Sequence, residues 1–296
     1  MSNWGKGVIN NIGWGQGGTN DIGYGSIYAD SNSGDTLLLK AESFFLDTFT
    51  GASLGLSLVK LRKEYSGFCI KVRRSSDNAE LDIGFVNNEL DTASLLTFVG
   101  SGNGFVTIIY DQVGSNNMTQ DRAVTQGQIV SNGVVNLKGG KPCIIRSANN
   151  NGGYTSTYAP NDGATVKGMF YVGDNEGKQS AIFGNNDGNG DYGFIVTSGS
   201  GSSPDGTDVT VTNTKINGSN TTISIRAQAF TATNNQFLLY REIEFNFNSN
   251  LLGLGYRTDD IFIEFGMFTF QELVIFENTD NAVAKENNIN ERYNIY

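Results

Sequence analysis

Apolar and polar residues alternate along much of the chain, and this pattern predicts an all-β protein. In 242–247 (EIEFNF), Ile243, Phe245 and Phe247 share one face of a strand and the polar residues share the other. Many such segments are separated by turns rich in Gly, Asn and Asp, which is typical of half-buried antiparallel strands in a jelly-roll β-sandwich. The predicted strands are 68–74, 80–85, 105–110, 134–137, 142–146, 168–172, 192–197, 208–212, 221–230, 236–240, 242–247, 251–256 and 266–276.

Three segments have the spacing of short helices, namely 53–65, 91–99 and 282–296. In the first, leucines at 54, 58 and 61 recur at helical spacing and Ser53 is a suitable N-cap. In the second, Asp91 can cap the helix and Gly100 can end it. The third is predicted to pack Ile289 and Tyr293 back onto the sandwich.

The first 34 residues form a repeat that cannot bury a core of its own. It reads WGKGVINNIG (4–13), WGQGGTNDIG (14–23) and YGSIYADSNSG (24–34), with one aromatic ring opening each unit. Periodic rings favour a segment that becomes ordered on a partner protein, and the alternative is a disordered Gly/Asn leader. We therefore predict an extended docking segment over 1–40 and a sandwich domain over 41–296. The predicted docking residues are Trp4, Gly5, Ile12, Trp14, Gly15, Ile22 and Tyr24.

Composition narrows the chemistry that this chain can perform. A net charge of −10 argues against nucleic acid and anionic membranes as partners, and no apolar run reaches the ~20 residues that a membrane span needs. The chain contains no histidine, so Ser-His-Asp sites, Cys-His sites and His-based zinc sites are excluded. Cys69 and Cys143 lie in apolar segments and are predicted to be buried free thiols rather than a disulfide. The N-terminus has no apolar signal-peptide region, so we expect synthesis in a cytoplasm.

Two long motifs carry a resemblance to a known family. Residues 73–85 (RRSSDNAELDIGF) and 106–114 (VTIIYDQVG) resemble the arabinofuranosidase-B-type catalytic domain, and 168–172, 252–255 and 270–276 follow in the order of that domain. The likeness spans about residues 45–296 and implies a concanavalin-like, lectin-like sandwich. The same block, behind a W-G-x-G leader, resembles structural proteins of bacteriophages. That likeness implies a virion spike or fibre protein, made in the host cytoplasm, placed on the virion surface by a capsid or tail protein, and homo-oligomeric.

The resemblance also implies two catalytic carboxylates, and the sequence lacks both at the matching positions. The nucleophile of the family follows a strand that aligns with 194–197, but here SGSGSS follows and the first acid is Asp205. The acid of the family aligns with Arg257. Asp259, Asp260 and Glu264 lie nearby, although turns and solvated faces commonly carry such residues. We therefore expect no hydrolase activity.

Two loops combine polar groups with an aromatic ring, as sugar recognition requires. They are 149–158 and 185–193, and the residues predicted to bind a ligand are Asn151, Tyr154, Asp187, Asp191 and Tyr192. Tyr158 and Tyr256 are further candidates for stacking on a sugar. The oxygen side chains of Asp187, Asn189 and Asp191 form a candidate calcium loop, for which a simple hairpin tip is the alternative. No other cofactor is expected.

Other polar motifs favour scaffold roles. Asp111 ends an apolar strand and is predicted to hold a loop through side-chain to backbone bonds. Arg73 and Arg74 lie near Asp77, Glu80 and Asp82, which indicates ion pairing around a turn. Together these observations predict a virion surface protein that attaches to a host glycan or receptor. The alternatives are a carbohydrate-active hydrolase and a purely structural capsid decoration protein.

Overall fold

The computed structural model describes residues 43–146, 153–160, 166–185, 193–207, 209–245, 252–258, 263–265 and 268–296. Contacts divide the chain into two units, Met1–Ser43 and Phe44–Tyr296, and every described helix and strand belongs to the second unit. The repeat, with all seven predicted docking residues, lies outside the described residues, so the division into a docking segment and a sandwich domain stays a prediction.

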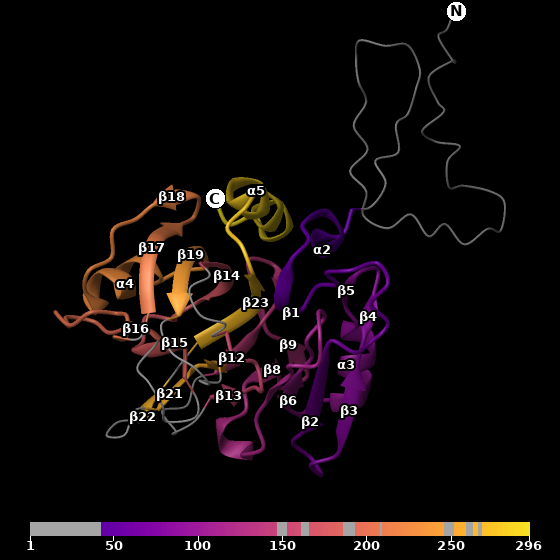
Figure 1. Cartoon of the computed structure of the whole chain (residues 1–296). Helices are drawn as coiled ribbons and strands as arrows, with labels where there is room; N and C mark the ends of the chain where they lie inside the picture. Colours follow the sequence, from indigo (N-terminus) through magenta and orange to yellow (C-terminus); the bar gives the residue numbers. More distant parts are fainter. Residues whose placement is uncertain are drawn as a thin grey trace, which may run out of the picture. The chain divides into compact units, whose positions relative to one another are not determined.

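One sheet contains the longest strands (Figure 1). Its antiparallel order is β18 (Ser219–Asn220), β17 (Val209–Ile216), β19 (Phe237–Phe245), β14 (Lys167–Asp174), β23 (Phe268–Phe276) and β1 (Ala52–Ser57). Strands β14 and β23 are buried along their whole length because the sheet is covered on both faces. The stretches 169–172 of β14 and 273–276 of β23 are therefore continuous apolar runs rather than alternating ones.

A second sheet packs against the first. Its antiparallel order is β3 (Glu80–Ile83), β2 (Ile70–Arg74), β6 (Gly104–Ile109), β7 (Met118–Thr119), β13 (Tyr154–Thr155), β20 (Leu252–Leu254), β15 (Ser180–Asn185) and β16 (Gly193–Val196). Strand β8 (Gln128–Ser131) pairs with β6 and with β9 (Val134–Val135). Strand β12 (Ile144–Arg146) pairs with both β8 and β23 and so joins the two sheets.

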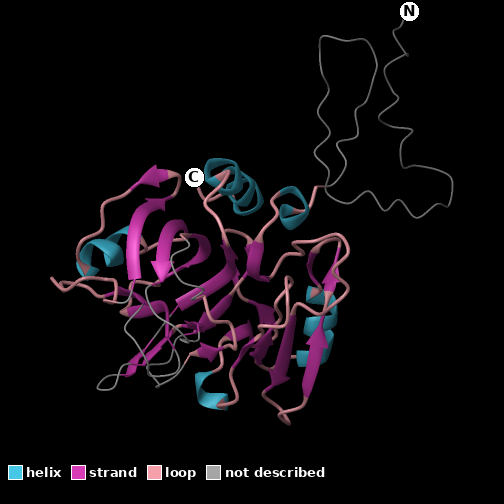
Figure 2. Cartoon of the chain, in the orientation of Figure 1, coloured by secondary structure: helices cyan, strands magenta, loops and turns pink. Residues whose placement is uncertain are grey.

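The remaining elements are short. The hairpins are β4 (Phe85–Val86) with β5 (Glu89–Leu90), β10 (Leu137–Lys138) with β11 (Lys141–Pro142), and β21 (Tyr256–Thr258) with β22 (Ile263–Phe265). The helices are α2 (Phe45–Thr48), α3 (Thr92–Val99), the 3-10 helix η1 (Ala123–Thr125), α4 (Arg226–Ala232) and α5 (Ala282–Tyr293). Figure 2 shows these helices at the margins of a body that consists mainly of strands. The predicted all-β sandwich is therefore confirmed.

Alternating residues of the long strands divide the core into two layers. Met169, Tyr171, Leu239 and Leu273 face the second sheet and belong to the main core. Their neighbours in sequence face the other way, into a smaller core that α2 and α5 cover. That smaller core includes Phe170, Val172, Leu238, Tyr240, Val274 and Phe276, together with Ile289 and Tyr293 of α5. The predicted packing of the C-terminal helix is thus confirmed.

The other helix predictions had mixed outcomes. Asp91 caps α3 by accepting a bond from the Ser94 amide, and Gly100 follows the helix, as predicted. The helix predicted over 53–65 is wrong, because Ala52–Ser57 form β1 and pair with β23. The strand predicted over 221–230 is also wrong, because Arg226–Ala232 form α4. There the Gln228 side chain accepts bonds from the Ser224 and Ile225 amides and caps the first turn.

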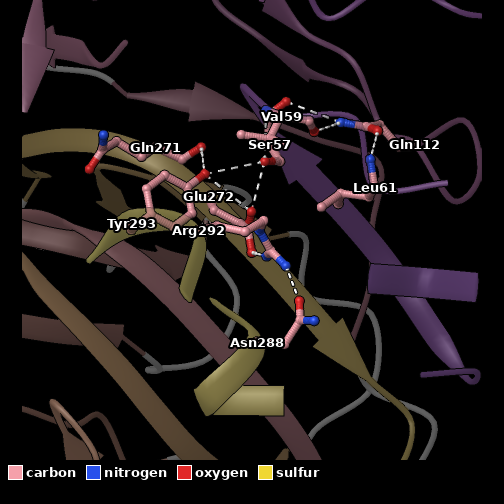
Figure 3. A network of polar contacts seen from close by, with 9 residues as sticks. All are labelled: Ser57, Val59, Leu61, Gln112, Gln271, Glu272, Asn288, Arg292 and Tyr293. Atoms are coloured by element: carbon pink, nitrogen blue, oxygen red, sulfur yellow. Dashed lines mark hydrogen bonds and ion pairs between the residues drawn. The ribbon is translucent and has the colours of Figure 1, made fainter. Parts of the chain in front are cut away.

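A buried polar network fastens α5 to the sheet (Figure 3). Glu272 of β23 is fully buried, and its carboxylate accepts a bond from the Ser57 hydroxyl at 2.8 Å and one from the Tyr293 hydroxyl at 3.2 Å. Arg292 completes the network with an ion pair to Glu272 at 2.5 Å. One carboxylate thus joins β1, β23 and α5.

Both cysteines are buried and free, as predicted. Within the described part of the chain, no group of three or more His, Cys, Asp or Glu residues could hold a metal ion. No helix there has both the length and the apolar character that crossing a bilayer requires.

Candidate functional site

The strand that the resemblance aligns with the nucleophile is β16, whose residues are all buried. The loop that follows β16 folds back on it, so that Phe194 forms a β-bridge with Asp205 and the Ile195 amide donates to the Pro204 carbonyl at 2.9 Å. The first acid after β16 in the sequence therefore lies beside the strand itself. The pattern of apolar and polar residues in the sequence did not predict this return of the loop.

Asp205 is held by a buried guanidinium. Arg241 of β19 donates two bonds to the Asp205 carboxylate, at 2.6 and 2.8 Å, and its side chain is only 2% exposed. The same guanidinium lies over the Phe194 ring, 4.6 Å from its centre. Two-point pairing of this kind fixes the carboxylate and compensates its charge. Asp205 therefore closes the loop back onto β16.

The region aligned with the catalytic acid lies in the β21–β22 hairpin. There the backbones of Arg257 and Glu264 stand opposite each other. Asp259 and Asp260 fall outside the described residues, so their predicted turn roles remain untested.

A second pair of carboxylates lies at the turn between β14 and β15. Lys138 contacts Asp174 at 2.5 Å and Glu176 at 3.2 Å, and Thr269 donates to Glu176 at 2.8 Å. Burial alone would lower the pKa of Lys138, but the hydrogen bonds to the two carboxylates outweigh it and raise that pKa above its usual value. One cation thus compensates both acids. Sequence reasoning missed this cluster because its members are far apart in the chain.

The predicted ligand residues divide into one that the structure places and four that it does not describe. Tyr154 is fully buried, which corrects the expectation of an exposed ring. Its hydroxyl donates to the Val106 carbonyl at 2.8 Å and accepts from the Gly127 amide at 2.9 Å, and burial raises its pKa. Tyr158 is also buried, with its hydroxyl 2.7 Å from that of Ser53. The other four predicted ligand residues lie outside the described residues, namely Asn151, Asp187, Asp191 and Tyr192. The calcium prediction, which also involves Asn189, is therefore not tested.

The predicted scaffold roles are well supported. Asp111 is buried and accepts backbone bonds from Gly55, Val113, Gly114 and Asn116 at 2.9 to 3.2 Å, which confirms that it holds a loop. The Arg74 guanidinium makes two bonds to Asp77, at 2.8 and 2.7 Å. These bonds lower the pKa of Asp77. Both motifs therefore act within the scaffold.

The fold defines the class of this molecule as an antiparallel, all-β sandwich. No family model matches the chain, and no curated protein matches it.

Solved structures offer a distant likeness. One is a GH54 α-L-arabinofuranosidase soaked with a cyclic sulfate inhibitor (18% identity, TM-score 0.44). Another is a mutant of a GH54 α-L-arabinofuranosidase soaked with 4-nitrophenyl α-L-arabinofuranoside (17%, 0.46). A third is an arabinofuranosidase complexed with arabinofuranosyl-α-1,2-xylobiose (17%, 0.43). The matches cover 80–82% of this chain and 62% of each of those chains.

Proposed function

We propose that this protein is a non-enzymatic surface component of a phage virion, a spike or a fibre. Its N-terminal segment docks on a capsid or tail protein, and its sandwich domain attaches to a host glycan. The W-G-x-G repeat at Trp4 and Trp14 and the motifs at 73–85 and 106–114 support the assignment to this class. The protein is expected to act as a homo-oligomer on the virion surface, and calcium is the only metal that its sequence suggests.

One observation carries the non-enzymatic part of the proposal. Asp205 is the first acid after the strand aligned with the nucleophile, and Arg241 holds it by two bonds. A retaining glycosidase needs a free carboxylate nucleophile about 5 Å from an acid. An acid that closes a loop through a buried ion pair cannot fill that role without breaking the pair.

The hydrolase alternative is favoured by one feature, the Asp174 and Glu176 pair on Lys138. The Glu176→Gln variant distinguishes a structural pair from a catalytic one. If the pair is structural, neither wild type nor Glu176→Gln has hydrolase activity. Activity of wild type that Glu176→Gln loses would favour the hydrolase.

Attachment is tested with purified full-length protein and host cells. The protein should bind the cells and should block adsorption of the phage. Periodate treatment of the cells, which cleaves vicinal diols of sugars, should abolish both effects. Binding that survives periodate would contradict a glycan receptor, and absence of binding would contradict attachment altogether.

Docking is tested by deleting residues 1–34. The truncated protein should fold, because the sandwich core draws on residues from Phe45 onward. It should be missing from purified particles. Normal incorporation of the truncated protein would contradict the docking role.

A further inference from the structure

A cleft of about 590 Å³ lies beside α2, away from the strands that the resemblance aligns with catalysis. Its lining includes Leu46 and Asp47 of α2, then Arg62, Glu64 and Tyr65 of the connection between β1 and β2, and Val113. The volume lies within the usual range for small-ligand sites, about 300–1,000 Å³. Figure 1 shows α2 close to β1.

The walls of the cleft are fixed by hydrogen bonds. The Leu46 amide donates to the Leu61 carbonyl and the Lys63 amide donates to Asp47, both at 2.9 Å, so α2 is tied to the 60–65 connection. Gln112 accepts from the Leu61 amide at 2.7 Å and donates to the Ser57 and Val59 carbonyls, as Figure 3 shows. Asp111 holds the opposite loop. Such a cleft needs little ordering to receive a ligand, which favours binding.

Two of the charged side chains that line this cleft are accessible to a ligand. Arg62 is half-buried and Glu64 is exposed, and among the described residues neither side chain has a hydrogen-bond or ion-pair partner. By contrast, Arg74, Arg241 and Arg292 each bind a carboxylate. A guanidinium and a carboxylate left unpaired on one rigid cleft form a ready set of donors and acceptors for a ligand.

An aromatic ring also lines the cleft. Tyr65 is half-buried, its ring meets the edge of Phe85 with centroids 6.2 Å apart, and its hydroxyl donates to the Phe68 carbonyl at 2.9 Å. A partly exposed ring next to hydrogen-bonding charges matches the two surfaces of a sugar, which has apolar C–H faces and polar hydroxyl edges.

We propose that this cleft binds an oligosaccharide, with Arg62, Glu64 and Asp47 on the hydroxyls and with Tyr65 on a ring face. The inference rests on the proposed glycan attachment and gives it a site. It also replaces the buried Tyr154 as the stacking residue. The concave shape and the charges of both signs favour a sugar over a flat protein surface.

The test uses full-length protein on an array of neutral pentose and hexose oligosaccharides and of uronate-containing oligosaccharides. Arg62→Gln and Tyr65→Leu should each weaken binding by about tenfold or more, because each removes a contact to the ligand. Glu64→Gln should weaken it too while keeping the shape of the side chain. The matched controls, Lys178→Gln and Tyr296→Ala, change exposed residues on other elements and should bind like wild type.

The outcomes separate the two proposals. If wild type binds and the three cleft variants bind equally well, the cleft is not the site, although glycan attachment stands. If wild type binds no oligosaccharide on the array, glycan attachment itself fails. If the cleft variants bind glycan normally but are missing from particles, the cleft docks a virion protein and the inference is overturned.

Unchanged thermal unfolding of the variants shows that any loss of binding is not a loss of folding. Comparison of the neutral with the uronate-containing oligosaccharides shows whether Arg62 binds a carboxylate or hydroxyls.

Discussion

The network around Glu272 and the cleft around Arg62 lie on neighbouring parts of the same scaffold. The charges of the network are paired with each other, whereas two charged side chains of the cleft have no partner among the described residues. Glu272 is fully buried, and both of its carboxylate oxygens are bound, by Arg292 on one side and by Ser57 and Tyr293 on the other. Arg62 and Glu64 have no partner among the described residues. Burying a charge is costly unless it is paired, so Glu272 needs its partners, whereas the half-buried Arg62 and the exposed Glu64 can be solvated and stay available to the proposed ligand.

The largest expected effect is on the network. Glu272→Ala removes the carboxylate that Arg292, Ser57 and Tyr293 bind, and leaves the Tyr293 hydroxyl with a longer bond to the Gln271 carbonyl at 3.5 Å. The free energy of unfolding should fall by about 3–5 kcal/mol. Arg62→Gln should change it by less than about 0.5 kcal/mol. Urea unfolding of the two variants measures the difference. Similar losses of unfolding free energy in both variants would contradict the distinction between the two regions.

A smaller effect is expected at Asp205, which is paired like Glu272 but is partly open to solvent, with 18% of its side chain exposed. Asp205→Asn should lower the free energy of unfolding by about 2–3 kcal/mol, because the buried Arg241 loses its carboxylate. Adding Arg241→Met should recover part of that loss, since no unpaired charge then remains. No recovery in the double variant would show that Asp205 acts through something other than this pair.

Asp205 also shows what the sequence could and could not predict. Alternation identified most strands, and Asp111 could be assigned as a loop holder because such bonds are local. The pairing of Asp205 with Arg241 joins positions 36 residues apart through a loop that folds back, which no periodicity reveals. For the same reason Tyr154, expected in an open loop, is buried between strands.

The errors in secondary structure have a related origin. Leucines at 54, 58 and 61 fit a helix, but Leu54, Leu56 and Leu58 also alternate with small residues as in a strand. The pairing that decides between the two is with β23, more than 200 residues away. In 221–230 the alternating Ile and Ala residues fit a strand. Arg, Ala and Gln are nevertheless good helix formers, and with the Gln228 cap they decide the outcome locally.

The smallest expected effect concerns Lys285 of α5, an almost fully buried cation without a carboxylate bond in the described structure. Its amino group lies 3.7 Å from the centre of the Phe276 ring. Burial lowers the pKa of Lys285 from 10.5 to about 8, although Asp280 acts in the opposite direction.

The folded state therefore disfavours the charged form, and between pH 8 and 10.5 the unfolded chain binds more protons. This residue should thus make the protein more stable as the pH rises through that window. Lys285→Met keeps the apolar stem and should remove a gain of about 2 kcal/mol between pH 7.5 and 9.5. Urea unfolding of both proteins at the two pH values isolates this contribution. The same pH dependence in both proteins would exclude it.

The central claim is that the sandwich binds sugar without hydrolysing it. The most direct measurement is the release of nitrophenolate from 4-nitrophenyl α-L-arabinofuranoside by full-length protein that binds the oligosaccharide array. We predict binding with no turnover above the rate without protein, for wild type and for Asp205→Asn and Glu176→Gln alike. Turnover that disappears when one of these acids, Asp259 or Glu264 is substituted would show that the protein is an enzyme and would contradict the proposed function.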